Sequence, residues 1–427
     1  MIRRIGGRAR ATAAASLVPL RRAAGAIPRA AAVVSRLSGG LAAASRLGAA
    51  PKDGVIRVGV DIRPFYEPLT GVGWYLAFLL EELARRADVE IVCFGEAARD
   101  EITPPLHAVL PRGLEPLAVD FRGLLPSAAG RRAAASALPV MAYLAACDLF
   151  FAPNYFLPRA LSAAAKRRVI TVHDLTYKRF PELLQKETLA NLEREMLREV
   201  SRADAIVCVS EATRSDLLEF YPVDPRKVYA VLSGPPPSRP ATANVLHLPE
   251  RYILFVSTIE PRKNLDVLIE AFEMVKDRGY PGDLVVAGKV GWKSERTLGR
   301  MAQTRWRASI RRLDYVERGQ LPGLYRRAEA FVLPSIYEGF GFPILEAMAE
   351  GTPVIAAENS SLPEVGGDAA LYFPTGDAGA LAEAIGKITT DAALRERLLA
   401  RGGANLARFS WERAAAETAA IFRRVAR

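Results

Sequence analysis

Residues 334–351 read PSIYEGFGFPILEAMAEG, a stretch that follows a short apolar segment. Gly339 and Gly341 permit a tight backbone path after a strand, at a place where side chains would obstruct a ligand. Pro343 suits the first turn of a helix, and Gly351 is a typical residue just beyond a helix end. The stretch therefore predicts a strand, a glycine-containing loop and a helix in succession, which is the repeating unit of an α/β fold.

The same alternation extends along the chain on both sides of this stretch. Apolar strands alternate with helices whose apolar residues recur at helical spacing, which predicts parallel sheets covered on both faces. Only the segment 95–145, rich in Pro, Ala and Arg, is too poorly periodic to place. The expected strands span 55–60, 89–94, 169–172, 205–209, 227–231, 252–257, 283–287, 330–334 and 354–357, and the expected helices span 74–86, 187–200, 210–220, 264–277, 295–310, 321–327, 343–350, 378–389 and 411–426.

A chain of 427 residues is too long for one hydrophobic core, so two domains are expected. Residues 233–240 include three consecutive prolines, which fit neither a helix nor a central strand and therefore predict a linker and candidate hinge. We expect one α/β domain at 53–235 and a second at 245–410. A final helix over 411–427 is expected to pack back on the first domain.

The net charge of +11 comes almost entirely from the first 52 residues, which hold ten basic side chains and no Asp or Glu. Without them, 48 basic residues face 47 acidic ones, so a nucleic-acid-binding face on the body is not indicated. The arginines recur throughout residues 1–52, and the longest uncharged stretch is too short to span a bilayer. A disordered tail without a role, an arm for anionic membranes, a transit peptide, or sequence upstream of the true start all remain open.

Three cysteines, Cys93, Cys147 and Cys208, lie far apart and have no CxxC spacing. They predict neither a disulfide framework nor a zinc site, and a reducing compartment is expected.

Glu338 and Glu346 are the candidate functional residues of the segment 334–351. The pattern places Glu338 on a loop at the carboxyl end of a strand and Glu346 in the first turn of the next helix. A helix N-terminus suits a phosphate, and carboxylates beside it can accept hydrogen bonds from sugar hydroxyls. Both glutamates would also be ordinary residues on a solvated loop and helix start.

Glu338 and Glu346, eight positions apart, match the E-x7-E motif of the retaining GT-B glycosyltransferases of family 4. The segments PSIYEGFGFPILEAMAEGTPVIA, SSLPEVGGDAALYF, STIEPRKNLDVLIEAF, DIRPFYEPLTGVGWY and VHDLTYKRFPE resemble the bacterial mannosyltransferase-like members of that family. The resemblance covers roughly residues 55–415 and implies a GT-B fold, two Rossmann-like domains facing across a cleft. The first domain would then bind the acceptor and the second the nucleotide sugar.

The resemblance implies roles for residues of the second domain. Glu346 would accept hydrogen bonds from the ribose, and Glu338 would contact the transferred sugar. Arg262 and Lys263 would neutralise the departing diphosphate. Thr258 stands where many members carry an arginine, and Arg262 is expected to cover that role.

Further donor contacts are implied on the same basis. Ser361 and Leu362 fall where the family offers backbone amides to phosphates, although Ser361 also suits a plain helix N-cap. Gly341 belongs to the donor loop. Val316 would face the nucleobase, with Tyr315 either beside it or in the core.

In the first domain, Gly71 and Gly73 form a GxG turn ahead of the helix at Trp74. The family uses this turn to bring amides near the donor phosphate and the acceptor, and a purely structural turn is the alternative. Trp74 often corresponds to an arginine in relatives, which puts an acceptor-phosphate contact in doubt. His173 and Asp174 follow a strand. A lone histidine is often structural, but the resemblance implies that His173 hydrogen-bonds the transferred sugar and that Asp174 orients it or helps position the acceptor.

The implied reaction is transfer of a hexose, mannose from GDP-mannose being favoured over glucose from UDP-glucose, with retention of configuration. The acceptor would be a growing or lipid-linked glycan in polysaccharide biosynthesis. No cofactor or metal is expected. The implied location is the cytoplasm, with peripheral contact to the inner face of the membrane as an option.

Two other classes compete with this interpretation. An NAD-dependent Rossmann oxidoreductase is disfavoured because Leu76 occupies the third glycine position of GxGxxG. A non-catalytic membrane- or nucleic-acid-binding protein would depend on residues 1–52.

Overall fold

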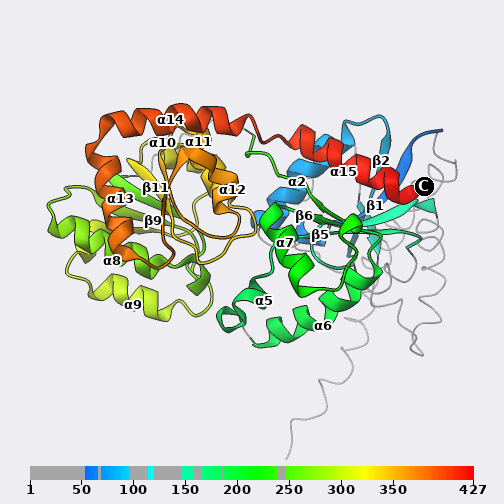
Figure 1. The fold of residues 1–427 in the computed structure, drawn as a ribbon, viewed down its shortest axis with the longest axis horizontal. Coiled ribbons are helices and arrows are strands. Elements are labelled where there is room, and N and C mark those ends of the chain that lie inside the picture. Colours follow the sequence, from blue (N-terminus) through cyan, green and yellow to red (C-terminus); the bar gives the residue numbers. More distant parts are fainter. Residues whose placement is uncertain are drawn as a thin grey trace, which may run out of the picture.

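The computed structural model describes residues 53–65, 69–96, 111, 114, 116–119, 146–157, 165–184, 186–237 and 247–427. The interpretations of residues 1–52, most of the segment 95–145 and part of the linker at 233–240 lie outside these residues. Within the described ranges, the chain forms two α/β domains that lie side by side (Figure 1).

The first domain is built on a parallel sheet of seven strands in the order β3-β2-β1-β4-β5-β6-β7. All six residues of β1 are buried, as expected for a central strand covered on both faces. Its strands are β1 (Ile56–Asp61), β2 (Val89–Glu96), β3 (Pro116–Val119), β4 (Leu149–Ala152), β5 (Arg168–Val172), β6 (Ala205–Cys208) and β7 (Val228–Ala230). Its main helices are α2 (Gly71–Ala84), α5 (Thr176–Arg179), α6 (Lys186–Arg202) and α7 (Glu211–Phe220), with short 3-10 turns at η1 (Arg63–Phe65), η3 (Pro181–Leu183) and η4 (Pro225–Lys227).

The second domain repeats this plan with six parallel strands in the order β10-β9-β8-β11-β12-β13. The strands are β8 (Tyr252–Val256), β9 (Asp283–Ala287), β10 (Ile310–Leu313), β11 (Ala330–Leu333), β12 (Val354–Ala357) and β13 (Ala370–Phe373). The helices are α8 (Leu265–Asp277), α9 (Glu295–Gln303), α10 (Leu321–Arg326), α11 (Phe342–Ala349), α12 (Leu362–Gly366), α13 (Ala378–Thr390) and α14 (Ala392–Leu406), with 3-10 turns at η5 (Pro261–Lys263), η6 (Arg307–Ser309), η7 (Arg318–Gln320) and η8 (Gly367–Ala369).

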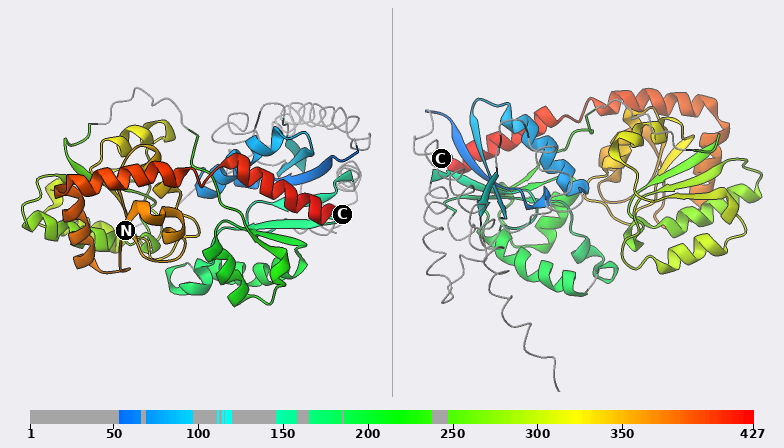
Figure 2. Two further views of the ribbon diagram at one scale, coloured as in Figure 1. Left: turned by 45° about the horizontal axis from the view of Figure 1, so that its top comes forward. Right: turned by 180° about the vertical axis from the view of Figure 1, so that it is seen from behind.

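The last helix, α15 (Trp411–Ala426), leaves the second domain and packs against α2 of the first (Figures 1 and 2). Trp411 is buried where the chain crosses back, and its indole N–H donates to the carbonyl of Pro235 at 2.8 Å. A Cβ on Gly234 would lie 2.5 Å from the backbone nitrogen of Trp411, so only glycine fits there. The two segments that pass between the domains, one at Gly234 and the other at Trp411, therefore contact each other.

Each predicted strand and helix has an observed counterpart, but one predicted helix is too long and several observed elements were not predicted. The helix expected at 295–310 ends at Gln303, and β10 follows it. β10 escaped prediction because it is an edge strand whose two central residues, Arg311 and Arg312, are exposed. β4, β13 and α14 were also not predicted from the sequence.

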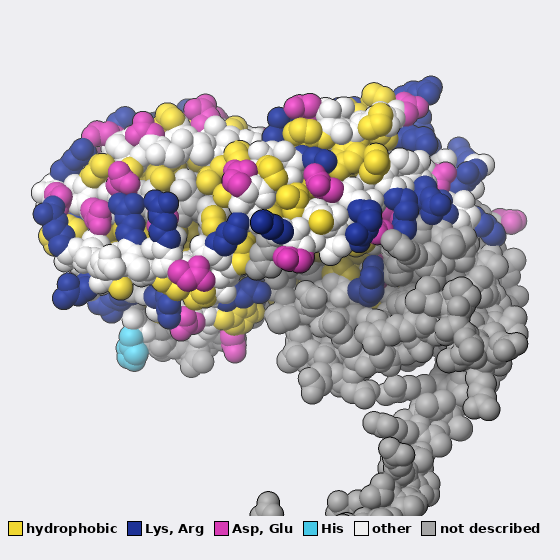
Figure 3. Space-filling view, turned by 90° about the horizontal axis from the view of Figure 1, so that it is seen from below, with side chains coloured by type: hydrophobic (Ala, Val, Ile, Leu, Met, Phe, Trp, Pro, Cys, Tyr) yellow, Lys and Arg dark blue, Asp and Glu magenta, His cyan; other side chains and the backbone are white. Residues whose placement is uncertain are grey.

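Basic and acidic side chains interleave on the described part of the face shown in Figure 3. The arginines of the second domain are largely paired: Arg300 with Glu270 and Glu273, and Arg311 with Asp283. Surface charge there is therefore locally balanced, as the composition of the body indicated.

Candidate active site

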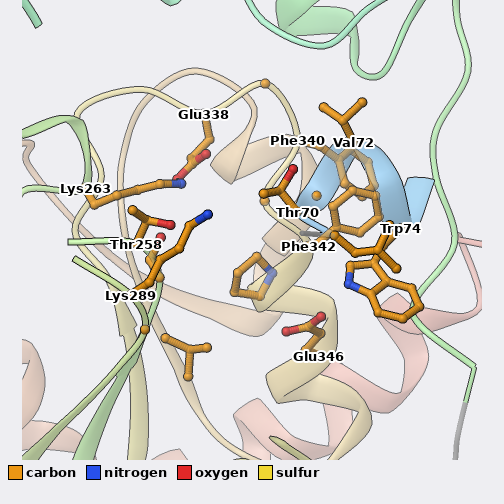
Figure 4. Close-up of a pocket in the computed structure, with 18 of the residues that line it drawn as sticks. Thr70, Val72, Trp74, Thr258, Lys263, Lys289, Glu338, Phe340, Phe342 and Glu346 are labelled. Carbon is orange, nitrogen blue, oxygen red and sulfur yellow. The ribbon is translucent and has the colours of Figure 1, made fainter. Parts of the chain in front are cut away.

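A cleft of about 570 Å³ lies between the two domains, and we call it the interdomain cleft. The strand order reverses at β1, between β2 and β4, and at β8, between β9 and β11. In open parallel sheets, ligands bind beyond the carboxyl ends of the strands at such reversals. Segments that follow β1, β5, β8, β9 and β11 line the cleft (Figure 4).

The loop between β11 and α11 needs its two glycines for different reasons. Gly341 has a φ of +106°, a left-handed conformation that glycine adopts without strain. Gly339 lies against the first domain, where a Cβ would come 1.7 Å from the carbonyl oxygen of His173. Pro343 lies in the first turn of α11, as predicted, but the helix begins at Phe342 and so places Glu346 in its second turn.

Glu338 is buried at the centre of a polar network. Its carboxylate accepts hydrogen bonds from Lys263 Nζ at 2.5 Å, Ser335 Oγ at 2.7 Å and Arg262 at 2.8 Å. Burial opposes ionisation of Glu338, yet the charges of Lys263 and Arg262 outweigh it and lower its pKa to about 2. The side chain is therefore an anion held by three donors.

Arg262 is engaged on several sides. Its guanidinium pairs with Glu260 at 3.0 Å and donates to Glu338 and to the carbonyl of Tyr337. Glu260 is itself buried, and that burial raises its pKa. Sequence reasoning missed Glu260, although its position beside Arg262 was a usable signal.

The sequence analysis also missed Lys289, which lines the cleft beside Thr258. In Figure 4 its ammonium points toward Lys263 and Glu338. Its place in the sequence could have identified it as a site residue, because Lys289 follows β9 by two residues and so lies at the carboxyl end of the sheet. Burial, followed by the charge of Arg262, lowers the pKa of Lys263.

Glu346 faces the opposite end of the cleft from Lys263 (Figure 4). It accepts a hydrogen bond from the hydroxyl of Tyr325 at 2.9 Å and lies 3.6 Å from Arg318. Val316 lines the same cleft, as does Tyr315, which is 64% exposed and so is not a core residue.

Ser361 and Leu362 lie behind the Glu338 loop and are not among the residues that line the cleft. The Ser361 hydroxyl is buried and donates to the carbonyls of Glu338 and Phe340, so it does not cap the helix that follows. The amide of Leu362 donates to the carbonyl of Asn359. In this structure both residues support the loop.

Gly71 and Gly73 belong to the first turn of α2, which corrects the predicted turn ahead of Trp74. The helix begins earlier because the carbonyl of Thr70 already accepts the amide of Trp74 at 3.0 Å. Gly71 lines the cleft, and a Cβ there would meet no atom within 4 Å. A Cβ on Gly73 would instead come 2.6 Å from the side chain of Leu69, so this glycine serves packing.

His173 and Asp174 both line the cleft from the end of β5. His173 Nε2 lies 2.7 Å from the carbonyl of Pro153, and because a carbonyl can only accept, that nitrogen carries the proton. Burial lowers the pKa of His173, which leaves Nδ1 of the neutral ring as an acceptor. The Asp174 carboxylate accepts the backbone amide of Thr176 at 3.0 Å.

Direct contacts join the domains around Gly339. Its carbonyl accepts hydrogen bonds from Ser210 Oγ at 2.6 Å and Thr213 Oγ1 at 3.2 Å, at the start of α7. The Glu364 carboxylate of the second domain accepts the amides of Glu211 and Ala212 in the first turn of the same helix.

A second contact involves Arg318, whose guanidinium lies 4.3 Å from the ring centroid of Trp74 and 5.1 Å from that of Phe78. Arg318 therefore connects Glu346 in the second domain with α2 in the first. Sequence reasoning singled out Trp74 only as a departure from an arginine and gave no signal for Arg318.

The described residues contain neither a metal-binding cluster nor a membrane-spanning helix. No group of three or more His, Cys, Asp or Glu side chains there could hold a metal ion. No helix within those ranges combines the length and the apolar character needed to cross a bilayer.

Known protein families match nearly the whole length of both domains. The family profile described as "Glycosyl transferases group 1" matches residues 242–403, and that described as "Glycosyltransferase Family 4" matches residues 69–239. The chain is 32% identical to O-antigen chain mannosyltransferase B of Escherichia coli over 386 residues, which is 83% of this chain and 96% of that relative. It is 31% identical to D-inositol 3-phosphate glycosyltransferase of Salinispora tropica over 84% of this chain and 83% of that one.

Solved structures share the fold. A sucrose-phosphate synthase of Thermosynechococcus elongatus superimposes with a TM-score of 0.64 at 22% identity, over 86% of this chain and 98% of that one. The Anabaena protein HepE in complex with UDP and glucose superimposes with a TM-score of 0.64 at 16% identity, over the same shares.

Proposed function

The chain belongs to the family 4 (group 1) glycosyltransferases and has their GT-B fold, and from this premise we propose that it transfers mannose from GDP-mannose to a growing or lipid-linked glycan, with retention of configuration. That it is a glycosyltransferase follows from the family. The oxidoreductase alternative is therefore not retained.

The observation that carries the proposal is the placement of Glu338 and Glu346 in one cleft. Glu338 lies with Lys263 at one end, and Glu346 lies at the other, 3.6 Å from Arg318. A nucleotide sugar has a base and ribose at one end and a sugar diphosphate at the other, so this arrangement suits its polarity. In the proposed pose, Glu346 accepts the ribose hydroxyls while Glu338 and His173 contact the transferred sugar.

The proposed chemistry uses positioning and electrostatic stabilisation. Lys263, Ser335 and Arg262 already hold the Glu338 carboxylate, which supports a positioning role for it and disfavours a covalent nucleophile. We infer that a diphosphate oxygen takes the acceptor proton as the bond to the anomeric carbon breaks. Trapping of a glycosyl-enzyme intermediate on a carboxylate would overturn this route.

The choice of mannose rests on the relative of 32% identity, an O-antigen chain mannosyltransferase. We expect Trp74 to make no contact with an acceptor phosphate, because it carries no charge where many relatives have an arginine. The reaction is proposed to need no metal or cofactor, so activity should persist in EDTA.

Contact with anionic membrane remains a proposal for residues 1–52 and their ten basic side chains. Sedimentation with phosphatidylglycerol vesicles, comparing the full chain with one that lacks residues 1–52, tests it. Equal sedimentation of the two proteins would exclude this role.

The experiment that tests the donor is a thermal shift assay with GDP, UDP, ADP and their sugars, without metal. A ligand at 100 times its Kd should add about 2.7 kcal/mol to stability. A shift with GDP and GDP-mannose that is lost in Glu346→Ala supports the proposal. A shift with UDP alone would redirect it to a UDP-hexose, and no shift in folded protein would refute the donor site.

A further inference from the structure

The polar network around Glu338 holds as much negative as positive charge. Arg262 and Lys263 supply two cations, and Glu260 and Glu338 supply two carboxylates, all four joined by contacts of 2.5 to 3.0 Å. Asp174, on the opposite side of the cleft, adds a further negative charge that acts on Arg262. The network by itself therefore offers no surplus positive charge to a diphosphate, whose phosphates bring at least two negative charges.

The guanidinium of Arg262 is largely occupied. It donates three hydrogen bonds, to Glu260, to Glu338 and to the carbonyl of Tyr337, and its Nη2 lies 3.0 Å from the Glu260 carboxylate. Moving it to a phosphate would leave the buried Glu260 without its cation, which is costly. These contacts suit a residue that holds the two carboxylates in place.

Lys289 differs from the other cations of the cleft. Four basic side chains line it: Arg262, Lys263, Lys289 and Arg318. Arg262 and Lys263 pair with carboxylates, and Arg318 lies 3.6 Å from Glu346 and packs on Trp74. Lys289 is exposed, and within the described part of the chain its ammonium makes no ion pair or hydrogen bond.

The backbone fixes Lys289 at the right place. Its carbonyl accepts the amide of Ile259 at 2.9 Å, and Val290 forms a bridge with Ile259, so the segment after β9 runs beside the segment after β8. The preceding Gly288 is in close contact with Ser257, where a Cβ would come 1.9 Å from the carbonyl oxygen. The lysine stem therefore starts next to Thr258, and its ammonium points toward Lys263 (Figure 4).

We propose that Lys289 supplies the surplus positive charge that binds the donor diphosphate, and that Arg262 is a positioning residue for Glu338 and Glu260. This inference rests on the proposed function and names a residue of that site. When the bond between the anomeric carbon and the diphosphate oxygen breaks, its electron pair stays on that oxygen. Lys289 then stabilises the charge gained by the leaving group.

The test compares nucleotides that differ only in their phosphates. Calorimetry gives the Kd of GDP, GMP, UDP and UMP for the wild type, Lys289→Met, Lys289→Arg and the control Lys387→Met. Lys387 is an exposed lysine of α13 in the same domain and does not line the cleft. Equal melting temperatures of the unliganded proteins verify that all are folded.

We expect Lys289→Met to weaken binding of the diphosphate by about 10- to 100-fold, which is the effect of one charge-assisted contact. Binding of the matching monophosphate should change by less than about threefold. Lys289→Arg should keep most of the diphosphate preference, and Lys387→Met all of it. The diphosphate preference of the wild type should also fall with added salt, whereas that of Lys289→Met should hardly change.

Two results would overturn the inference and leave the proposed function intact: an unchanged diphosphate Kd in Lys289→Met, or equal losses for diphosphate and monophosphate. If the folded wild type bound none of the four nucleotides, the proposed function itself would fail, and the inference with it.

Discussion

Adding a single methyl group at Gly339 should separate the two domains without disturbing either core. The Cβ of an alanine there would lie 1.7 Å from the carbonyl oxygen of His173 and 3.0 Å from the Cβ of Asp174. Cβ atoms in proteins essentially never come within 3.0 Å of a non-bonded heavy atom, so the loop after β11 must retreat by about 1.3 Å. This retreat would strain the short hydrogen bond from Ser210 to the carbonyl of residue 339.

The expected result is a large loss of turnover with little loss of donor binding. Misplacing reacting groups by about 1 Å can cost on the order of 100-fold in rate. We therefore expect Gly339→Ala to lower kcat by about 100-fold while the Kd for the nucleoside diphosphate changes by less than about threefold. Release of nucleoside diphosphate measures the first quantity, and calorimetry measures the second.

Gly386→Ala is the matched control, because a Cβ at this position in α13 meets no atom within 4 Å. It should leave kcat unchanged and stabilise the helix by up to about 1 kcal/mol. Wild-type turnover in Gly339→Ala would refute the idea that the approach of residue 339 to His173 is needed for catalysis. An equal loss of binding and turnover would show that the loop itself had been disrupted.

Three further tests address the rest of the site. Glu346→Gln should weaken binding of a nucleoside diphosphate by about tenfold and narrow the preference for ribose over 2′-deoxyribose, measured by calorimetry; an unchanged preference would place the ribose elsewhere. In a double-mutant cycle, the effects of Arg318→Met and Trp74→Ala on kcat/KM should be coupled by about 0.5–2 kcal/mol. Strictly additive effects would show that the cation–π contact does not contribute to activity. The folded-state pKa of Glu338, about 2, lies below its ordinary value of 4.5, so ionised Glu338 stabilises the fold above about pH 4.5, and up to about 3 kcal/mol of this stability is lost as the pH falls toward 2. In thermal melts, the melting temperature of Glu338→Gln should therefore fall less steeply with decreasing pH than that of the wild type. The same dependence of melting temperature on pH in both proteins would contradict this.

Much of the fold followed from local pattern. Buried strands such as β11 and β12 are continuous apolar runs, and α15 spans the residues that its periodicity predicts. One strand escaped prediction because of its position in the sheet. β10 exposes two arginines because it lies at an edge, so its sequence lacks the apolar run of a central strand.

The site was predictable where the chain itself brings groups together. Glu338 and Glu346 are separated by one loop and one helical turn, so the sequence places both beside the start of α11. Lys263 and Arg262 were identified as cations of this site, but their partners were not. Pairing of Arg262 with Glu260 and of both cations with Glu338 depends on how η5 packs against the loop after β11.

By itself, the sequence determined the two α/β units, the family and the carboxylates of the cleft, because strands, helices and short motifs are local properties of the chain. Only the tertiary structure decided the contacts that join distant segments. Among these are the approach of Gly339 to His173, the packing of Arg318 on Trp74 and the placement of Lys289 beside Thr258. The physical reason is that these pairs are set by the packing of one strand end or domain against another, and no periodicity along the chain encodes that packing.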